Sequence, residues 1–388
     1  MLSNESIRYM SLEIYCMRWQ IRAASAVAVV IVSLESSVAA DDRLFIRLPT
    51  EVASARSIGL GGATVALGGE TSGLASNPAS LVAVSRSLDV TVAAGTRGAC
   101  TIGLAIHPLA TAAGGLILPC PWKDRPAADV RVPLVAASDG TESLRPKDGR
   151  WFGLAGAWMP DHRVALGGLV QVDTLRLLGD NGQSRRDSWI NWSLGAFVQP
   201  DWADGTRVGV AFRHGTNRTF AGDDAGTLDD PGISRSVRRP DILSFGVAWR
   251  YAWLKNTRIV VSIQPELVRY PKVLSGATGN ELDLRTGAEA WFPFGHCVSG
   301  CGGMWQLRAG LISRSAIPAS LPLRTSGRDP SKRTTSWTAG FSLAPELGGG
   351  KFKLDLAYSD ESETFVCGIA YRFPNAFRGD LEHHRSRP

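Results

Sequence analysis

The side chains that could carry out chemistry are few in this sequence and lie far apart along it. Four histidines are spread over the middle of the chain and two more lie near its end, as follows: His107, His162, His214, His296, His383 and His384. No Ser, His and Asp share one segment with the spacing of a nucleophilic triad, although such a triad is defined in space. We interpret these histidines as residues of strand ends, turns and a tail, and we predict that the protein is not an enzyme.

The glycine-rich stretch near the N-terminus lacks the spacing of a nucleotide-binding loop. Gly59, Gly61 and Gly62 form Gly-Leu-Gly-Gly, which precedes no clear strand and helix unit. The Gly-Lys-Ser/Thr ending of a phosphate loop is also missing. The carboxylates of residues 222–230 could attract calcium, but we favour a solvated loop. We therefore predict no cofactor and no metal site.

Two pairs of cysteines are candidate disulfides. Cys297 and Cys301 are close enough in sequence to pair in an oxidising compartment. Together with His296 they imitate a metal site, but a fourth ligand is lacking, so we favour the disulfide. Cys100 and Cys120 flank a predicted hairpin and could pair if their Cα atoms lie within about 7 Å. For this second pair the free thiols remain an equal alternative.

From Ser87 onward the dominant pattern is an alternation of apolar with polar or very small residues. In Lys351 to Ser359, for example, Phe352 and Leu354 alternate with Lys353 and Asp355. Successive residues of a strand face opposite sides, so each such segment has one apolar face. About fourteen segments show the pattern, a number that suits a membrane barrel. They begin near Ser87, Thr101, Gly115, Trp151, Arg163, Trp189, Thr206, Ile242, Thr257, Leu282, Met304, Ser336, Lys351 and Thr364. We predict an all-β fold, a transmembrane antiparallel β-barrel of about 14 strands over residues 87–373.

The connections between these segments support a membrane barrel independently. Short connections near residues 159–162, 200–205 and 252–256 alternate with long ones near 174–188, 215–241 and 265–281. Outer-membrane barrels have short periplasmic turns and long extracellular loops, whereas a soluble sandwich has no reason to alternate them. Two connections break this alternation: 293–303 is too long for a turn, and 360–363 is too short for an outer loop.

Charged residues on the second face of these segments predict a polar lumen. An Arg or Lys side chain that faced lipid near the bilayer centre would cost about 2–4 kcal/mol of folding stability. The predicted lumen network consists of Arg207, Arg258, Asp283, Arg285, Glu289, Arg308, Lys353 and Asp355. Its mixed signs favour ion pairs that hold a plug over an ion filter of one sign.

The N-terminal segment predicts export from the cytoplasm, and together with the barrel pattern it predicts the outer membrane of a Gram-negative-type bacterium. An apolar run from Ala23 to Leu34 precedes Val38-Ala39-Ala40, so residues 1–40 are a predicted signal peptide whose true start could be Met17. Residues 41–86 are a predicted hatch or plug, and residues 374–388 a polar tail. The net charge of +6 is small, and no nucleic-acid-binding motif accompanies it.

Residues 53–81 carry a recognisable motif, ASARSIGLGGATVALGGETSGLASNPASL. It resembles the N-terminal signature of the FadL-like (FadL/TodX-like) outer-membrane transporters and of the related PorV/PorQ-type barrels. The matching positions are Ala55-Arg56, Gly59, Gly61-Gly62-Ala63, Glu70 to Ser72 and Asn77-Pro78-Ala79. Ser80 departs from the glycine that is commoner in the family, and Gly69 and Glu70 stand where Asp is commoner.

This resemblance implies passive uptake of hydrophobic small molecules of the long-chain fatty acid type. It assigns hatch and gating roles to Gly59, Gly61, Gly62, Asn77, Pro78 and Ala79, with simple packing of a plug as the alternative. The implied partners are a hydrophobic ligand, membrane lipid, lipopolysaccharide and the barrel-assembly machinery, with the protein a monomer and no nucleic acid bound. The alternatives are a PorV-like barrel that shuttles or anchors secreted proteins, and a structural barrel without transport.

Overall fold

The computed structural model describes the chain in segments, all within a compact unit that spans residues 41–388. The segments are 43–45, 54–68, 71–83, 87–95, 100–109, 112–119, 132–133, 143–161, 163–178, 184–200, 205–215, 217–220, 235–238, 241–254, 257–273, 277–294, 303–314, 334–347, 350–360 and 364–374. The predicted signal peptide and the predicted tail after Pro374 lie outside these residues.

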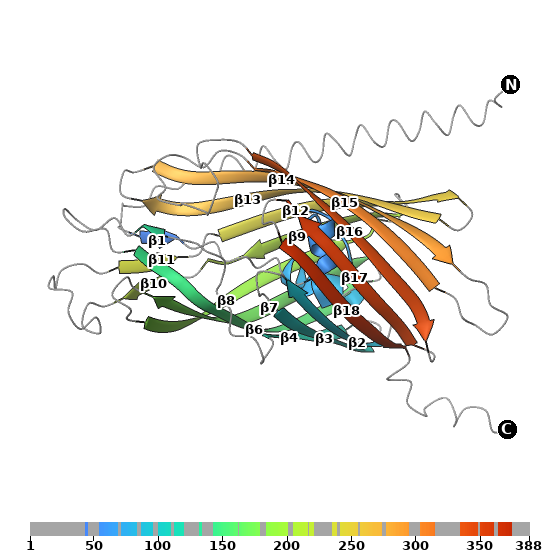
Figure 1. Ribbon diagram of the computed structural model, residues 1–388, viewed down its shortest axis with the longest axis horizontal. Helices are drawn as coiled ribbons and strands as arrows, with labels where there is room; N and C mark the ends of the chain where they lie inside the picture. The colour runs from blue at the N-terminus through green and yellow to red at the C-terminus, as the bar shows by residue number, and fades with distance from the viewer. Residues whose placement is uncertain are drawn as a thin grey trace. The chain divides into compact units, whose positions relative to one another are not determined.

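Fourteen strands of the described chain close into one ring (Figure 1). The strands are β2 (Ser87–Gly95), β3 (Cys100–Leu109), β4 (Ala112–Pro119), β6 (Ser143–Asp161), β7 (Val164–Leu178), β8 (Ser184–Val198), β9 (Thr206–Arg213), β12 (Asp241–Leu254), β13 (Thr257–Val273), β14 (Ala277–Phe294), β15 (Gly303–Arg314), β16 (Thr334–Leu347), β17 (Gly350–Ser359) and β18 (Thr364–Pro374). Each strand pairs antiparallel with its neighbours, and β18 pairs with β2 to close the ring. Closure satisfies the backbone groups without water and leaves no free sheet edge in the ring.

The predicted barrel is therefore confirmed, with about the predicted strand starts. Four strands begin at the predicted residue (Ser87, Thr206, Thr257 and Thr364). The largest difference is at β6, which begins at Ser143 instead of Trp151. This strand reaches farther because backbone pairing with β7 continues to Arg145 and Leu178, where the apolar alternation has already faded.

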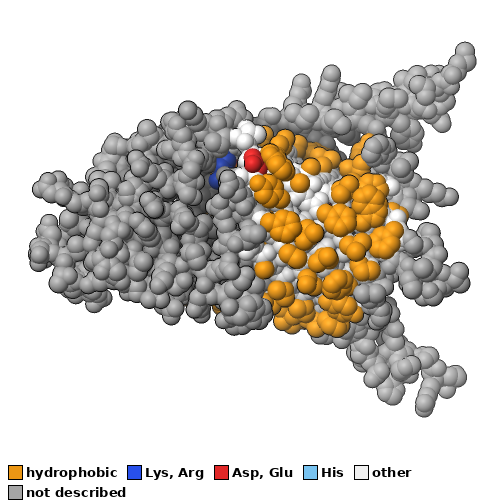
Figure 2. All heavy atoms as spheres, viewed as in Figure 1, with side chains coloured by type: hydrophobic (Ala, Val, Ile, Leu, Met, Phe, Trp, Pro, Cys, Tyr) orange, Lys and Arg blue, Asp and Glu red, His pale blue; other side chains and the backbone are white. Residues whose placement is uncertain are grey.

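The two faces of the ring differ as the alternation predicts. On β15, Leu307 and Leu311 are 45% and 52% exposed, whereas Gln306 and Arg308, the neighbours of Leu307, are 5% and 4% exposed. Figure 2 shows hydrophobic side chains spread over the described outer face in view. Lipid accepts such an apolar outer surface, and the charged side chains, which lipid would strongly disfavour, face the interior. The barrel therefore spans a membrane. Among the described residues, no helix is long and apolar enough to cross a membrane.

A second, small sheet lies outside the ring and was not predicted. It consists of β1 (Arg43–Phe45), β10 (Asn217–Phe220) and β11 (Arg235–Arg238), with β1 parallel and β10 antiparallel to β11. Because β10 and β11 belong to the long connection after β9, this sheet stands at the end of the barrel opposite the short connections (Figure 1). These strands are too short to show an alternation in the sequence. A further short strand, β5 (Val132–Pro133), pairs with β6.

Candidate functional site: the segment inside the barrel

Residues 54–68 and 71–83, here called the inner segment, pass through the interior of the ring. Its described residues contain only short helices of five or six residues: α2 (Ala55–Gly59), η1 (Thr71–Ala75) and η2 (Pro78–Ala83). α2 contacts β15 to β18, whereas η2 contacts β6, β7 and β8 on the other side of the ring (Figure 1). The Ser54 hydroxyl caps α2 by accepting from the Ser57 N–H at 3.0 Å. The chain thus crosses the lumen from one wall to the other.

Glycine is required where the inner segment turns after α2. Gly61 and Gly62 have φ of 62° and 78°, a left-handed conformation that residues with a Cβ rarely adopt. A Cβ on Gly61 would also lie 3.2 Å from the backbone of Leu311 on β15. Both conformation and space therefore exclude a larger residue at Gly61.

The wall meets the inner segment through glycines of its own. Three pairs of wall glycines lie directly opposite each other on neighbouring strands: Gly167 and Gly195, Gly209 and Gly246, and Gly287 and Gly310. A Cβ on Gly167 would lie 2.6 Å from the carbonyl carbon of Pro78, and one on Gly287 would lie 2.7 Å from the carbonyl oxygen of Leu60. Such distances leave no room for any side chain. We name these six residues the glycine seats; they let the backbone of the segment rest on the backbone of the wall.

A buried ion network ties α2 to the wall. Arg56 of α2 donates to both carboxylate oxygens of Glu289 on β14, at 3.2 and 2.7 Å. Arg308 on β15 donates to the same Glu289 at 2.6 Å and to Asp355 on β17 at 2.8 Å. Ser342 also donates to Asp355. Glu289 is 1% exposed, so its charge depends on these two guanidinium groups in place of water.

Asn77 forms the second polar anchor. Its amide nitrogen donates to the carbonyl oxygens of Val65 and of Ala196 on β8, both at 2.9 Å, and its side-chain oxygen accepts from the Ala79 N–H at 3.1 Å. Three strands along the ring from β8, Gln264 of β13 accepts a hydrogen bond from the Val65 N–H at 2.9 Å. Asn77 is fully buried, and its side chain links two turns of the inner segment to the barrel.

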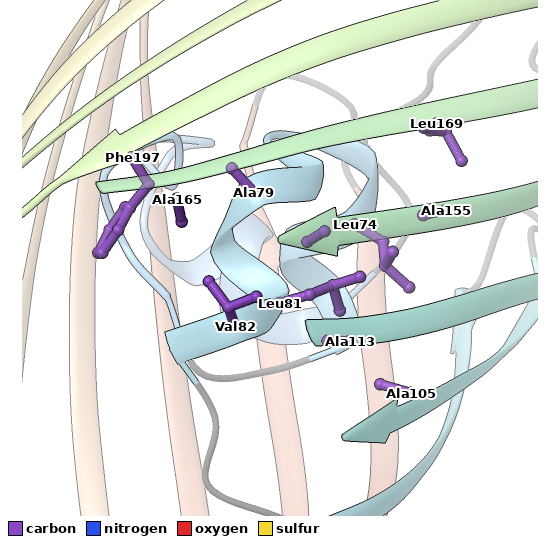
Figure 3. Packing of buried hydrophobic residues seen from close by; sticks show 11 residues of the cluster. Leu74, Ala79, Leu81, Val82, Ala105, Ala113, Ala155, Ala165, Leu169 and Phe197 are labelled. Atoms are coloured by element: carbon purple, nitrogen blue, oxygen red, sulfur yellow. The ribbon is translucent and has the colours of Figure 1, made fainter. Parts of the chain in front are cut away.

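An apolar cluster fills the lumen on the other side of the inner segment. Figure 3 shows Leu74, Leu81 and Val82 of the segment packed among side chains of the wall. The wall residues are mostly small, namely Ala105, Ala113, Ala155, Ala157, Ala165, Leu169 and Phe197. The lumen therefore has an apolar cluster on the side of β3 to β8, beside the buried polar side chains of Gln171, Asn191 and Ser193, and a charged side along β13 to β17.

A further charged group lies beside the glycine turn. Arg285 on β14 is 1% exposed and donates to Glu266 of β13 at 3.2 Å. Asp283 lies 3.7 Å from Arg285 and 3.5 Å from Arg314. The Arg285 side chain also fills the space where a Cβ of Gly62 would stand. Acids and bases are thus paired on this side of the lumen.

The structure places the remaining residues of the predicted network differently. Lys353 lies 3.2 Å from Asp355, and Arg207 lines a small pocket described below. Arg258 is exposed, because it stands next to the short connection between β12 and β13. The alternation could not distinguish a strand end from the middle of the lumen.

Other sequence candidates fall largely outside what the structure describes. Cys297, Cys301 and Cys120 lie outside the described residues, as does the loop 222–230, and for Cys100 only the backbone is described. Cys367 on β18 is a free thiol. Within the described segments, no group of three or more His, Cys, Asp or Glu side chains is arranged to hold a metal ion.

Sequence reasoning missed two features of this site. The glycine seats occupy inward positions of the alternation, and a scan for glycine at those positions would have found them. The contact of Asn77 with Ala196 had no such signal, because it joins residues distant in sequence through a backbone carbonyl group.

Among known proteins, this chain is similar at a low level to several solved outer-membrane channels. No family model and no curated protein matches the sequence. Among solved structures, the CymD monoaromatic hydrocarbon channel is 15% identical with a TM-score of 0.44, over 81% of this chain and 94% of that one. A Pseudomonas aeruginosa FadL homologue is 11% identical with a TM-score of 0.47, over 84% and 98%. The Pseudomonas putida toluene transporter TodX is 12% identical with a TM-score of 0.42, over 82% and 97%. The likeness is weak, so the fold and the site of this chain rest on its own residues.

Proposed function

We propose that this protein is an outer-membrane barrel for the passive uptake of hydrophobic small molecules, with molecules like long-chain fatty acids as the first candidates. The observation that carries the proposal is the apolar side of the lumen, where Leu74 and Leu81 pack against Leu169 and small wall residues. A channel for hydrophilic solutes has a polar, water-filled interior. Apolar side chains along the lumen could instead contact a hydrophobic molecule as it passes, without unpaired charges being desolvated.

The inner segment would act as a hatch that yields to the ligand. At the glycine seats it rests on the wall through backbone contacts, so no side chains of the wall interlock with it at those points. We assign hinge and gating roles to Gly59, Gly61, Gly62, Asn77, Pro78 and Ala79. Asn77 and Arg56 would hold the closed state, because their hydrogen bonds join the segment to the wall.

An uptake assay with paired solutes tests this proposal. The protein would be expressed in a bacterial host that lacks its own channel for hydrophobic compounds, and accumulation of labelled oleate and toluene would be compared with that of labelled lactose. We expect faster entry of a hydrophobic solute than in cells with an empty vector, and no change for lactose. Equal entry of all three solutes would indicate a general pore.

No gain for any solute, with the barrel folded in the outer membrane, would refute the proposal. A barrel that shuttles secreted proteins, or a purely structural one, would then be the better assignment. Folding is checked separately by the heat-dependent shift in electrophoretic mobility, because a closed barrel stays compact in detergent until it is heated.

A further inference from the structure

A small pocket lies between the inner segment and the wall, near the short connections of the barrel. It is lined by Leu67 and Arg56 of the segment and by Arg207, Trp249, Arg250 and Trp291 of the wall. Its free volume is about 30 Å³. This space suits one small ion and is too small for a hydrophobic ligand.

The charges around this pocket are not balanced by its lining. Three of its lining residues are arginines, and no Asp or Glu lines it among the described residues. Arg56 is engaged with Glu289 at 2.7 Å. The positive charges of Arg250 and Arg56 both act on Arg207. Arg250 is exposed, whereas burial shields part of Arg207 from water, so the repulsion that acts on Arg207 is stronger than between fully solvated charges.

Two donors at this pocket lack an acceptor. The Arg207 guanidinium lies over the Phe197 ring, 5.5 Å from its centroid, and its side chain forms no hydrogen bond or ion pair within the described structure. The indole Nε1 of Trp291 is buried and has no hydrogen-bond partner there either. Arg207 and Trp291 come from different strands, β9 and β14, yet line the same small space. Both can only donate, so the missing group is an acceptor.

We propose that this pocket binds one small monovalent anion, a halide or a small carboxylate, held by the Arg207 guanidinium and the Trp291 indole N–H. The anion offsets the repulsion between Arg207, Arg250 and Arg56. Because Arg56 belongs to the inner segment and the other two residues to the wall, a bound anion strengthens the contact between segment and barrel. This inference does not depend on the proposed uptake of hydrophobic molecules.

The test measures how bromide slows unfolding of the full-length mature protein in detergent. Sodium bromide replaces sodium gluconate, which is too large for the pocket, at constant ionic strength. A ligand at ten times its dissociation constant stabilises the folded state by a factor of about eleven. We expect bromide at ten times its dissociation constant to slow thermal unfolding by about this factor, with the slowing growing in proportion to 1 + c/Kd, where c is the bromide concentration. The same measurement with sodium formate in place of sodium bromide tests whether the pocket also binds a small carboxylate.

Three variants locate the effect. Arg207→Gln should abolish the slowing by bromide, and Trp291→Phe, which keeps the ring and removes the N–H, should weaken it. Arg163→Gln changes an exposed arginine beside the connection between β6 and β7, at the same end of the barrel, and should leave the effect intact.

Diffraction from wild-type crystals soaked in bromide keeps the proposal testable even if Arg207→Gln does not fold. An anomalous peak within hydrogen-bonding distance of both Arg207 and Trp291 Nε1 supports it. A peak without this slowing of unfolding would mean an adventitious ion only. That result, the absence of a peak at this pocket, or slowing that persists in Arg207→Gln would each overturn the proposal.

Discussion

Replacing Glu289 by Gln is the sharpest test of how the inner segment is held. Glu289 accepts hydrogen bonds from Arg56 on one side and Arg308 on the other, and it is 1% exposed. Glutamine keeps the size of the side chain but removes its negative charge. One of its two acceptor oxygens also becomes an amide donor, which must face a guanidinium group.

The expected loss of stability in Glu289→Gln follows from the charge of Arg56, which remains buried without its partner. Arg308 keeps Asp355 at 2.8 Å, but the bidentate pair between Arg56 and Glu289 is lost. Removing one partner of a buried ion pair costs about 3–5 kcal/mol, because the other charge stays desolvated. If this interaction is absent from the transition state for unfolding, the rate of unfolding rises by about 10² to 4 × 10³-fold, since each 1.4 kcal/mol is about a factor of ten.

The assay follows the heat-dependent change in electrophoretic mobility of the detergent-purified barrel over time at one temperature. Rates are the appropriate measure, because membrane barrels often unfold irreversibly outside their lipid. Asp360→Asn is the matched control, since it makes the same chemical change at an exposed residue after β17. The double variant Arg56→Gln with Glu289→Gln removes both charges of the pair and should recover part of the loss.

Unfolding of Glu289→Gln at a rate within about twofold of the wild type would refute this reasoning, because the expected cost is far larger. It would mean that Arg56 is solvated in the folded barrel. No recovery in the double variant would place the cost elsewhere than in the pair.

Three further predictions concern the seating, the gating and the outer face of the barrel. Gly209→Val should lower the stability of the barrel, because a Cβ there would lie 2.6 Å from the carbonyl carbon of Val65. The displaced inner segment should also raise the conductance of the barrel for small ions in planar bilayers. Unchanged conductance would contradict the close contact between the inner segment and the wall. Ala55→Cys with Gly368→Cys should form a disulfide, since the two Cβ positions lie 3.8 Å apart, the usual separation in a disulfide. Oxidation of this variant should reduce uptake of hydrophobic solutes to the level of the empty vector and reducing agent should restore it, whereas uptake unaffected by oxidation would exclude a shift of α2. Leu307→Arg should cost about 2–4 kcal/mol of folding stability in lipid vesicles, measured by denaturant titration with Leu307→Val as the mild control, and a neutral result would contradict an outward-facing position in lipid.

The sequence by itself determined the class of fold and the two faces of the wall. The alternation is a local property, because neighbouring residues of a strand must point to opposite sides. Phe341 and Leu343 are therefore exposed, and Ser342 between them is buried, as the pattern predicts. The connections near 200–205 and 215–241 likewise differ in length as a membrane barrel requires.

Only the tertiary structure decided which of the inward residues meet. That Glu289 lies between Arg56 and Arg308 depends on strand register and on the path of a segment more than two hundred residues away in sequence. The glycine seats depend on the same register, since a shift of a strand by one residue would turn its glycine seat outward. Periodicity carries no information about register between distant segments, so these contacts follow from closure of the barrel around the inner segment.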